Sequence, residues 1–177
     1  MNSMYPTFSN KTAVIPEGQE VEFLDPPAYS PKVYLAGKMT GLSYQVMKEW
    51  RVTAAVKLKA AGFTIIDPTD QIDREEFTKT IHYDRDMGAY NLPATEVVDV
   101  NVYHMRRADI ILAEFMFQEV SLGTVGEVIV AARELHKPVI AWGDNGAVSH
   151  AWVRRHLTAH RKQLEDAINF IIDVYRG

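Results

Sequence analysis

The chain lacks cysteine, long basic runs and long hydrophobic segments, and each absence excludes a class of protein. Its 177 residues contain no cysteine, which excludes a disulfide framework, a thiol nucleophile and a cysteine-ligated metal. No basic run is longer than Arg106-Arg107 or Arg154-Arg155, and the formal net charge is −4. This balance argues against polymeric nucleic acid or a membrane surface as the main partner.

No segment approaches the roughly 18 apolar residues of a membrane span, and the N-terminus lacks the basic and then apolar pattern of a signal peptide. We therefore expect a cytoplasmic protein with no membrane partner. His156 and His160 stand four residues apart, but no third ligand accompanies them, so we predict no metal and no cofactor. The hydrophobic content of 47% is enough to bury the core of one domain.

Proline marks the boundary of that domain. Residues 1–31 contain prolines at 6, 16, 26, 27 and 31, which favours an extended N-terminal arm ahead of a domain over residues 32–177. Within the domain the apolar spacing predicts alternating strands and helices, with a long polar segment over 69–94. The expected strands are 33–36, 63–66, 109–113 and 138–142, and the expected helices are 43–61, 95–107, 124–136 and 151–175.

Strands that alternate with helices imply right-handed crossovers and a mostly parallel sheet. We expect an α/β flavodoxin/Rossmann-like three-layer sandwich. A strand order of 2-1-3-4 would place the loop over 34–41 opposite the turn over 121–127, at the carboxyl edge where open sheets bind ligands.

The turn over 121–127 has the composition of a ligand site. Ser121 or Thr124 can cap the following helix, and glycines at 123 and 126 let backbone approach a ligand closely. The free N–H groups of a helix N-terminus attract anions and would keep the carboxylate of Glu127 ionised. A glutamate at this position is also a common partner of the helix dipole, with no catalytic role.

The order strand, Ala-Glu, loop, Ser-Leu-Gly-x-x-x-Glu, helix, Lys-Pro-Val over residues 108–141 resembles the nucleoside 2-deoxyribosyltransferase superfamily, especially its 2'-deoxynucleoside 5'-monophosphate N-hydrolases. The segment Val33-Tyr-Leu-Ala-Gly-Lys-Met-Thr-Gly41 is similar to that family's first strand and phosphate loop. Together with their helices the two segments span residues 32–150.

The resemblance implies an enzyme that cleaves the N-glycosidic bond of a (deoxy)nucleoside 5'-monophosphate and releases free base, by hydrolysis or by base transfer. Glu127 would be the nucleophile and Tyr34 would orient it. The neighbouring subunit of a homodimer, or of a higher homo-oligomer, would lend Ser149, although an N-cap of the helix at 151 is the first interpretation of that serine. The implied substrate-binding residues are Gly37, Lys38, Thr40, Gly41, Ser121, Gly123 and Ser149.

One position departs from the family pattern. Seven residues before Ala108 the family has an aspartate that handles the leaving base, and this chain has Asn101. An amide can bond a base edge but cannot act as an acid, which leaves Asp84, Asp86 or Asp99 as alternative acids. The substitution, with two extra residues before Ser121, also favours a second hypothesis, a non-catalytic nucleotide-binding or signalling module. A third is glycohydrolase action on a dinucleotide such as NAD.

Overall fold

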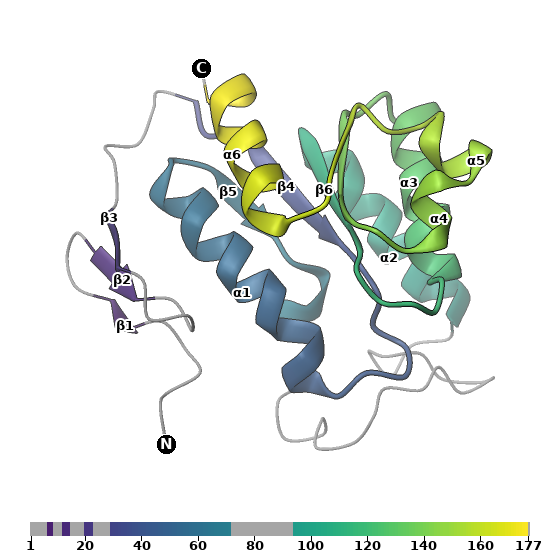
Figure 1. The fold of residues 1–177 in the computed structure, drawn as a ribbon, viewed down its shortest axis with the longest axis horizontal. Coiled ribbons are helices and arrows are strands. Elements are labelled where there is room, and N and C mark those ends of the chain that lie inside the picture. The colour runs from purple at the N-terminus through teal and green to yellow at the C-terminus, as the bar shows by residue number, and fades with distance from the viewer. Residues whose placement is uncertain (1–6, 9–11, 15–19, 23–28, 72–93, 177) are drawn as a thin grey trace.

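The computed structural model of the chain describes residues 7–8, 12–14, 20–22, 29–71 and 94–176 (Figure 1). Three short strands come first, namely β1 (Thr7–Phe8), β2 (Thr12–Val14) and β3 (Glu20–Glu22). The elements that follow are β4 (Lys32–Ala36), α1 (Tyr44–Ala60), β5 (Thr64–Ile66), the 3-10 helix η1 (Pro68–Gln71), α2 (Ala94–Arg107), β6 (Ile110–Phe115), α3 (Leu122–Arg133), β7 (Val139–Gly143), α4 (Gly146–Ser149), α5 (Ala151–Arg154), β8 (Ala159–Arg161) and α6 (Leu164–Tyr175).

The main sheet is parallel and has the strand order β5-β4-β6-β7-β8. This confirms the predicted α/β flavodoxin/Rossmann-like fold and the order 2-1-3-4 of its first four strands. It also places β4 and β6 side by side, with Tyr34 paired in register with Ile111. The loops that leave these two strands therefore meet at the carboxyl edge of the sheet.

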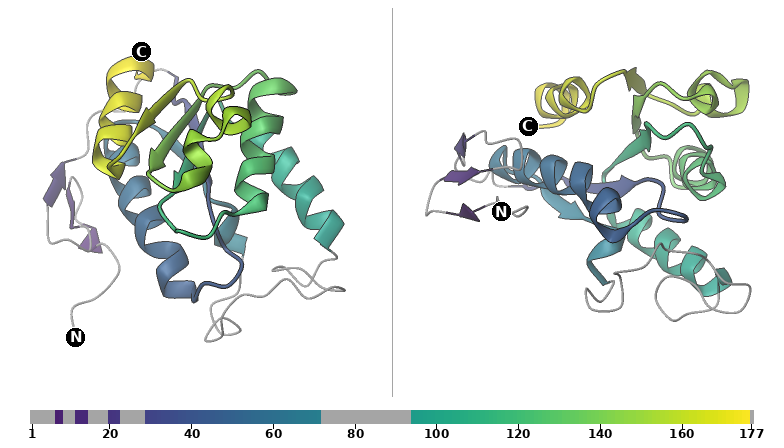
Figure 2. Two further views of the ribbon diagram at one scale, coloured as in Figure 1. Left: turned by 45° about the vertical axis from the view of Figure 1, so that its right-hand side comes forward. Right: turned by 60° about the horizontal axis from the view of Figure 1, so that its bottom comes forward.

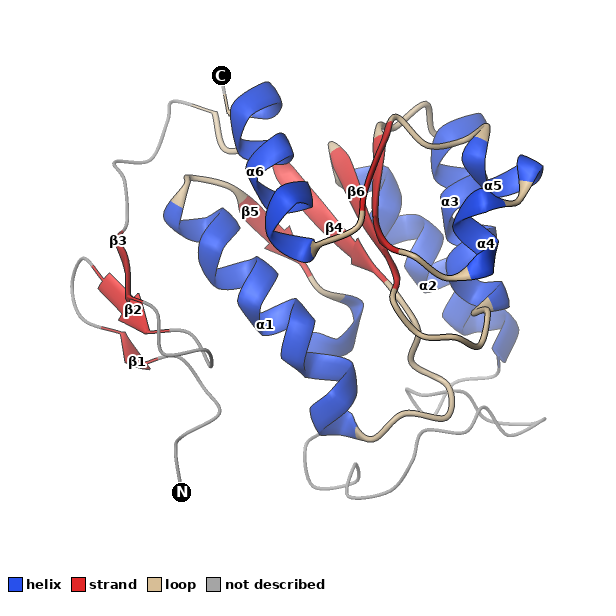
Figure 3. Cartoon of the chain, in the orientation of Figure 1, coloured by secondary structure: helices blue, strands red, loops and turns tan. Residues whose placement is uncertain are grey.

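Successive side chains of the central strands point to opposite faces of the sheet and pack in two separate hydrophobic clusters. Val33 and Leu35 pack in one cluster with Trp50 and Ile168, while Tyr34 and its neighbours on the other face pack with α2 and α3. Figures 2 and 3 show the resulting three layers, with α1 and α6 on one face of the sheet and α2 to α5 on the other. One face of β4 therefore packs against α1 and α6, while the other face, which carries Tyr34, packs against α2 and α3.

The single helix expected over 151–175 is wrong. The chain there forms α5, then β8, then α6. Thr158 closes the turn before β8, because its N–H donates to the Val139 carbonyl at 2.8 Å and its hydroxyl accepts from the Val139 N–H at 3.1 Å. β8 therefore pairs with the edge of β7. With three residues it is too short to show a periodic hydrophobic pattern in the sequence. His156 and His160 consequently do not share a helix.

The three short strands near the N-terminus pair with one another. They form an antiparallel sheet in the order β1-β2-β3, and β3 contacts α1 (Figure 1). A domain boundary at residue 32 stays a prediction. Within the described part of the chain, no helix has the length and apolar character needed to span a membrane, and no three metal-ligating side chains gather.

Two of the three tryptophans lie in the core. The rings of Trp50 and Trp142 meet edge to face, with their centroids 5.6 Å apart, and both residues are buried. Trp152 is 67% exposed and lies at the surface of the chain.

Candidate active site

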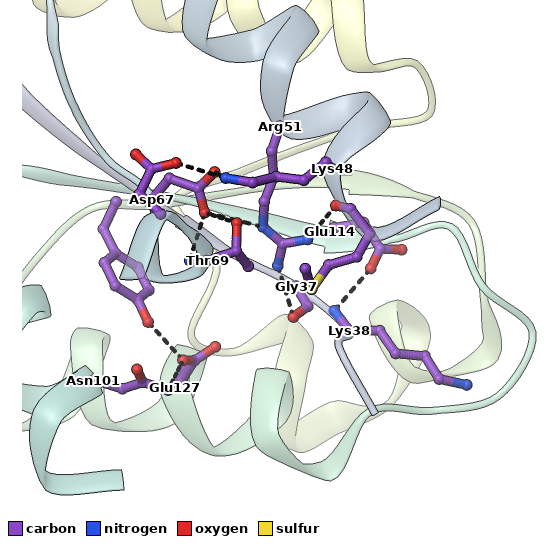
Figure 4. Close-up of polar contacts among 12 residues, drawn as sticks. Gly37, Lys38, Lys48, Arg51, Asp67, Thr69, Asn101, Glu114 and Glu127 are labelled. Atoms are coloured by element: carbon purple, nitrogen blue, oxygen red, sulfur yellow. Dashed lines mark hydrogen bonds and ion pairs between the residues drawn. The ribbon is translucent and has the colours of Figure 1, made fainter. Parts of the chain in front are cut away.

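Glu127 accepts two hydrogen bonds on one carboxylate oxygen. The Tyr34 hydroxyl donates to Oε1 at 2.8 Å, and the Asn101 amide Nδ2 donates to the same oxygen at 3.2 Å (Figure 4). These three side chains come from β4, α2 and α3. The structure therefore brings together Glu127, Tyr34 and Asn101, the three positions to which the family pattern gives catalytic roles, and leaves Oε2 with no hydrogen-bond donor among the described residues.

The phenol of Tyr34 reaches Glu127 because of the pleat of β4. Tyr34 is fully buried and packs in the cluster formed with α2 and α3. A buried phenol requires a hydrogen-bond partner, and the carboxylate of α3 provides it. The packing of the sheet face thus fixes the distance between strand and carboxylate.

Burial raises the pKa of Glu127 to about 7, against the opposing effects of the Tyr34 hydrogen bond, the positive charge of Arg51 and the Asn101 hydrogen bond. The expectation that the helix N-terminus would keep this carboxylate ionised is therefore wrong at neutral pH, because removal from water outweighs the favourable contacts. The pKa of this carboxylate therefore lies near neutral pH. Such a group can take up or release a proton near neutrality.

Asn101 has one unused acceptor. Its Oδ1 is buried and has no hydrogen-bond partner among the described residues, while its Nδ2 is bound to Glu127. Nδ2 faces the carboxylate because an ionised carboxylate only accepts hydrogen bonds and the amide nitrogen can donate one. Asp99, on the same helix, has an exposed side chain. Asp84 and Asp86 lie outside the described residues.

Lys38, expected to hold a phosphate, is paired with a carboxylate. Its Nζ lies 2.7 Å from Oε2 of Glu119, and the Lys38 side chain is 11% exposed whereas that of Glu119 is 88% exposed. The ammonium also lies 6.0 Å from the centre of the Phe117 ring. A phosphate that binds Lys38 must therefore displace or share the loop carboxylate.

The remaining residues of the loop after β4 divide into packing and exposed positions. Gly37 is required by packing, because an added Cβ would lie 2.7 Å from the Trp50 ring. Thr40 and Gly41 are exposed, and Gly41 has φ of +79° with open space where a side chain would stand. Thr40 and Gly41 therefore remain candidates for ligand contact. Close packing against Trp50 explains the glycine at position 37 without a ligand.

Ser121 caps α3. Its Oγ accepts from the Thr124 N–H at 3.2 Å and from the Thr124 hydroxyl at 2.9 Å, and Gly123 leaves ordinary room for a side chain. Ser121 and Gly123 thus lie on the same element as Glu127. Ser149 ends α4 and is exposed. His150, not Ser149, is the N-cap of α5, so the N-cap interpretation of Ser149 is wrong.

Two buried charges in the site escaped the sequence analysis. Glu114 is 3% exposed; it accepts from the Lys38 N–H at 3.1 Å, from the Phe117 N–H at 3.2 Å and from the Met116 N–H. It therefore ties the loop after β4 to the loop after β6. A glutamate within the apolar run of β6 was the available signal, since an ionised side chain is rarely buried without partners.

Arg51 is the second missed residue, and it is fully buried. Its Nη2 donates to the Gly37 carbonyl at 2.9 Å and its Nη1 to the Met47 carbonyl at 2.7 Å. Its Nε lies 3.6 Å from Oδ1 of Asp67. Asp67 also accepts from Lys48 at 2.8 Å (Figure 4). Arg51 therefore joins α1 to the loop after β4 and acts on Glu127 through its charge.

Comparison with known proteins identifies the fold. No family model matches the chain, and no curated protein matches its sequence. Among solved structures it is similar to a 2-deoxyribosyltransferase from the psychrotolerant bacterium Bacillus psychrosaccharolyticus, with a TM-score of 0.56 and 22% identity over 78% of this chain and 90% of that chain. A signal receiver domain of a diguanylate cyclase from Desulfovibrio desulfuricans G20 gives a TM-score of 0.44, 13% identity and coverage of 82% and 95%. The first likeness shows a shared fold.

Proposed function

We propose that this chain is an enzyme that cleaves the N-glycosidic bond of a (deoxy)nucleoside or its 5'-monophosphate, with Glu127 as the nucleophile. The observation that carries the proposal is the arrangement of the Glu127 carboxylate, in which Tyr34 and Asn101 hold Oε1 and Oε2 has no donor among the described residues. The fold shared with a 2-deoxyribosyltransferase and the resemblance of the Ser-Leu-Gly-x-x-x-Glu segment support it.

The reaction has two steps. Oε2 of ionised Glu127 attacks C1', and the bond between C1' and the base nitrogen breaks with its electron pair going to the base. Water or a second base then attacks C1' of the glycosyl ester and restores the carboxylate, which gives hydrolysis or base transfer. Tyr34 holds the carboxylate in position by its hydrogen bond to Oε1.

The leaving base must take its proton from a group other than Asn101, because an amide is not an acid at neutral pH. The unpartnered Oδ1 of Asn101 instead offers an acceptor to an N–H or O–H of the substrate. This chemistry suits a base that departs readily or is protonated by water.

A non-catalytic nucleotide-binding module is the second candidate. One observation favours it, namely the amide at position 101, which removes the acid that would protonate the leaving base but can still bond a nucleotide. Binding of a nucleotide without release of its base would support this alternative.

The deciding experiment is chromatographic detection of free base after incubation with ribo- and deoxyribonucleosides and their 5'-monophosphates, with and without an acceptor base. We expect base release by the wild type and none by Glu127→Gln. Glu134→Gln, at the C-cap of the same helix, is the matched control and should retain activity. No release from any substrate, with nucleotide binding retained, would overturn the catalytic proposal.

We further propose a homodimer or higher homo-oligomer, in which Ser149 of α4 is exposed and available to a neighbouring subunit's substrate. Sedimentation tests the assembly. Ser149→Ala tests the serine, because a contact to the substrate phosphate predicts a higher KM for the monophosphate with little change for the nucleoside.

A further inference from the structure

An open hollow lies at the end of the sheet away from Glu127. The turns before β7 and β8 line this cavity, whose volume is about 550 Å³. Pro138 and Thr158 line it and immediately precede these two parallel strands, which places it at the amino edge of the sheet. Glu127 lies midway along α3, six residues before Arg133, and does not line the cavity, so the cavity is separate from the candidate active site.

The lining of this cavity is basic. Five of its residues carry a cationic or titratable nitrogen, and no aspartate or glutamate lines it. Arg133, Lys137 and Arg155 make no ion pair with any described residue, whereas Lys38, Lys48 and Arg51 at the carboxyl edge are all paired. The basic lining residues are Arg133, His136, Lys137, Arg155 and His156.

His156 adds a buried and directional group. It is 7% exposed, and its Nδ1 is bound to the Trp152 carbonyl. Because a carbonyl only accepts, Nδ1 carries the hydrogen and Nε2 is left for another partner. The Trp152 ring stacks on His156 with an interplanar angle of 9°, so the imidazole is held in one orientation at the cavity wall.

His136 also reaches this cavity through an unusual backbone. Its φ is 52°, in the left-handed region, and among the described residues it alone is a non-glycine with positive φ. A glycine is the ordinary residue after a helix end of this kind, where the Lys137 N–H donates to the Ala131 carbonyl at 2.9 Å. A histidine in that position adds a further ring nitrogen to the lining.

We propose that this cavity binds a small molecule carrying two or more linked phosphate groups, such as a polyphosphate or a nucleoside polyphosphate. Three permanent positive charges without partners match the charge of a diphosphate, and guanidinium groups bond phosphate oxygens in pairs. The volume lies within the roughly 300–1,000 Å³ of small-molecule sites. The cationic lining disfavours a metal ion, and the net charge of −4 disfavours a long nucleic acid.

The test is calorimetric titration of the full chain with inorganic pyrophosphate and, separately, with inorganic phosphate. We expect pyrophosphate to bind at least tenfold more tightly than phosphate. Arg133→Gln and Arg155→Gln should each weaken pyrophosphate binding by roughly tenfold. Arg154→Gln is the matched control, because Arg154 is exposed on α5 next to Arg155 and does not line the cavity.

Glu127→Gln should bind pyrophosphate as the wild type does, which separates this site from the candidate active site. A measurement without variants is protection of Lys137 from acylation by pyrophosphate, compared with exposed Lys59. Absence of pyrophosphate binding, an equal loss in Arg154→Gln, or tighter binding of a short DNA duplex through the same arginines would each overturn the proposal.

Discussion

The two ends of the parallel sheet differ in whether their cationic side chains are paired with anionic or carbonyl groups. At the carboxyl end, Lys38 pairs with Glu119, and Arg51 is enclosed by carbonyls and by Asp67. At the amino end, the three permanent cations around the cavity have no such partners in the described part of the chain. A paired cation holds loops and tunes a neighbouring carboxylate, while an unpaired one remains available to an anion from solution.

This difference explains the state of Glu127. The charge of Arg51 favours its ionised form, but the carbonyls and the carboxylate around Arg51 share that charge, and burial dominates. The carboxyl end is therefore organised around a carboxylate that titrates near pH 7.

The largest expected effect is on chemistry. Glu127→Gln removes the nucleophile while an amide oxygen can still accept from Tyr34 and Asn101. We expect base release to fall by roughly a thousandfold or more, measured as kcat by chromatography, with substrate Kd little changed. Residual activity within tenfold of the wild type would show that another group attacks C1'.

Arg51→Met should have the largest effect on stability. It leaves two carbonyls and the Asp67 carboxylate without their buried partner, and such a loss typically costs about 3 to 5 kcal/mol. Urea unfolding at pH 7 measures it. Lys59→Met, at an exposed position of the same helix, is the control and should change the free energy of unfolding by less than about 0.5 kcal/mol.

Replacing Glu127 should also stabilise the fold, in a manner that depends on pH. The pKa is about 7 in the folded protein and 4.5 in the reference state, so between these values the folded state binds more protons and stability falls as pH rises. Well below pH 4.5, Glu127 is protonated in both the folded and the unfolded protein. Glu127→Gln should therefore gain up to about 3 kcal/mol over the wild type at pH 8, relative to pH 4.

The corresponding measurement is urea unfolding of both proteins at several pH values. A difference between them that stays constant from pH 4 to pH 8 would contradict the raised pKa. Base release should show the same transition, because only the ionised form attacks. We expect kcat/KM to rise with pH through about 7.

The fold was predictable because β4, β6 and β7 are apolar runs that only a buried parallel sheet accommodates. The position of Glu127 on the helix after such a strand was also predictable, while its role as nucleophile came from the resemblance and stays a proposal. The strand β8 was not, since Ala159-His160-Arg161 has no strand pattern and pairs only because the edge of β7 is open. The basic cavity was equally hidden, because its residues come from two turns that are distant in sequence and meet only in the sheet.

Glu119→Gln tests whether the pairing of Lys38 decides substrate choice. Removing the carboxylate frees the ammonium for a 5'-phosphate, because Glu119 is the exposed partner of this ion pair. We expect kcat/KM for a monophosphate to rise roughly fivefold relative to its nucleoside. Glu165→Gln removes the exposed partner of Lys57 elsewhere on the surface and should leave that ratio unchanged.

The smallest expected effect separates two roles of Ser121. Ser121→Ala removes the N-cap of α3 and should lower the free energy of unfolding by about 1 kcal/mol. Ser121→Asp keeps an oxygen that accepts from the Thr124 N–H, so its stability should stay near that of the wild type, while its negative charge would repel a phosphate. If only the cap matters, the aspartate variant cleaves nucleoside and monophosphate in the wild-type ratio. If the hydroxyl contacts a phosphate, the variant loses cleavage of the monophosphate and keeps cleavage of the nucleoside. The carboxyl end of the sheet would then bind an anion through backbone and hydroxyl groups, without an unpaired lysine or arginine.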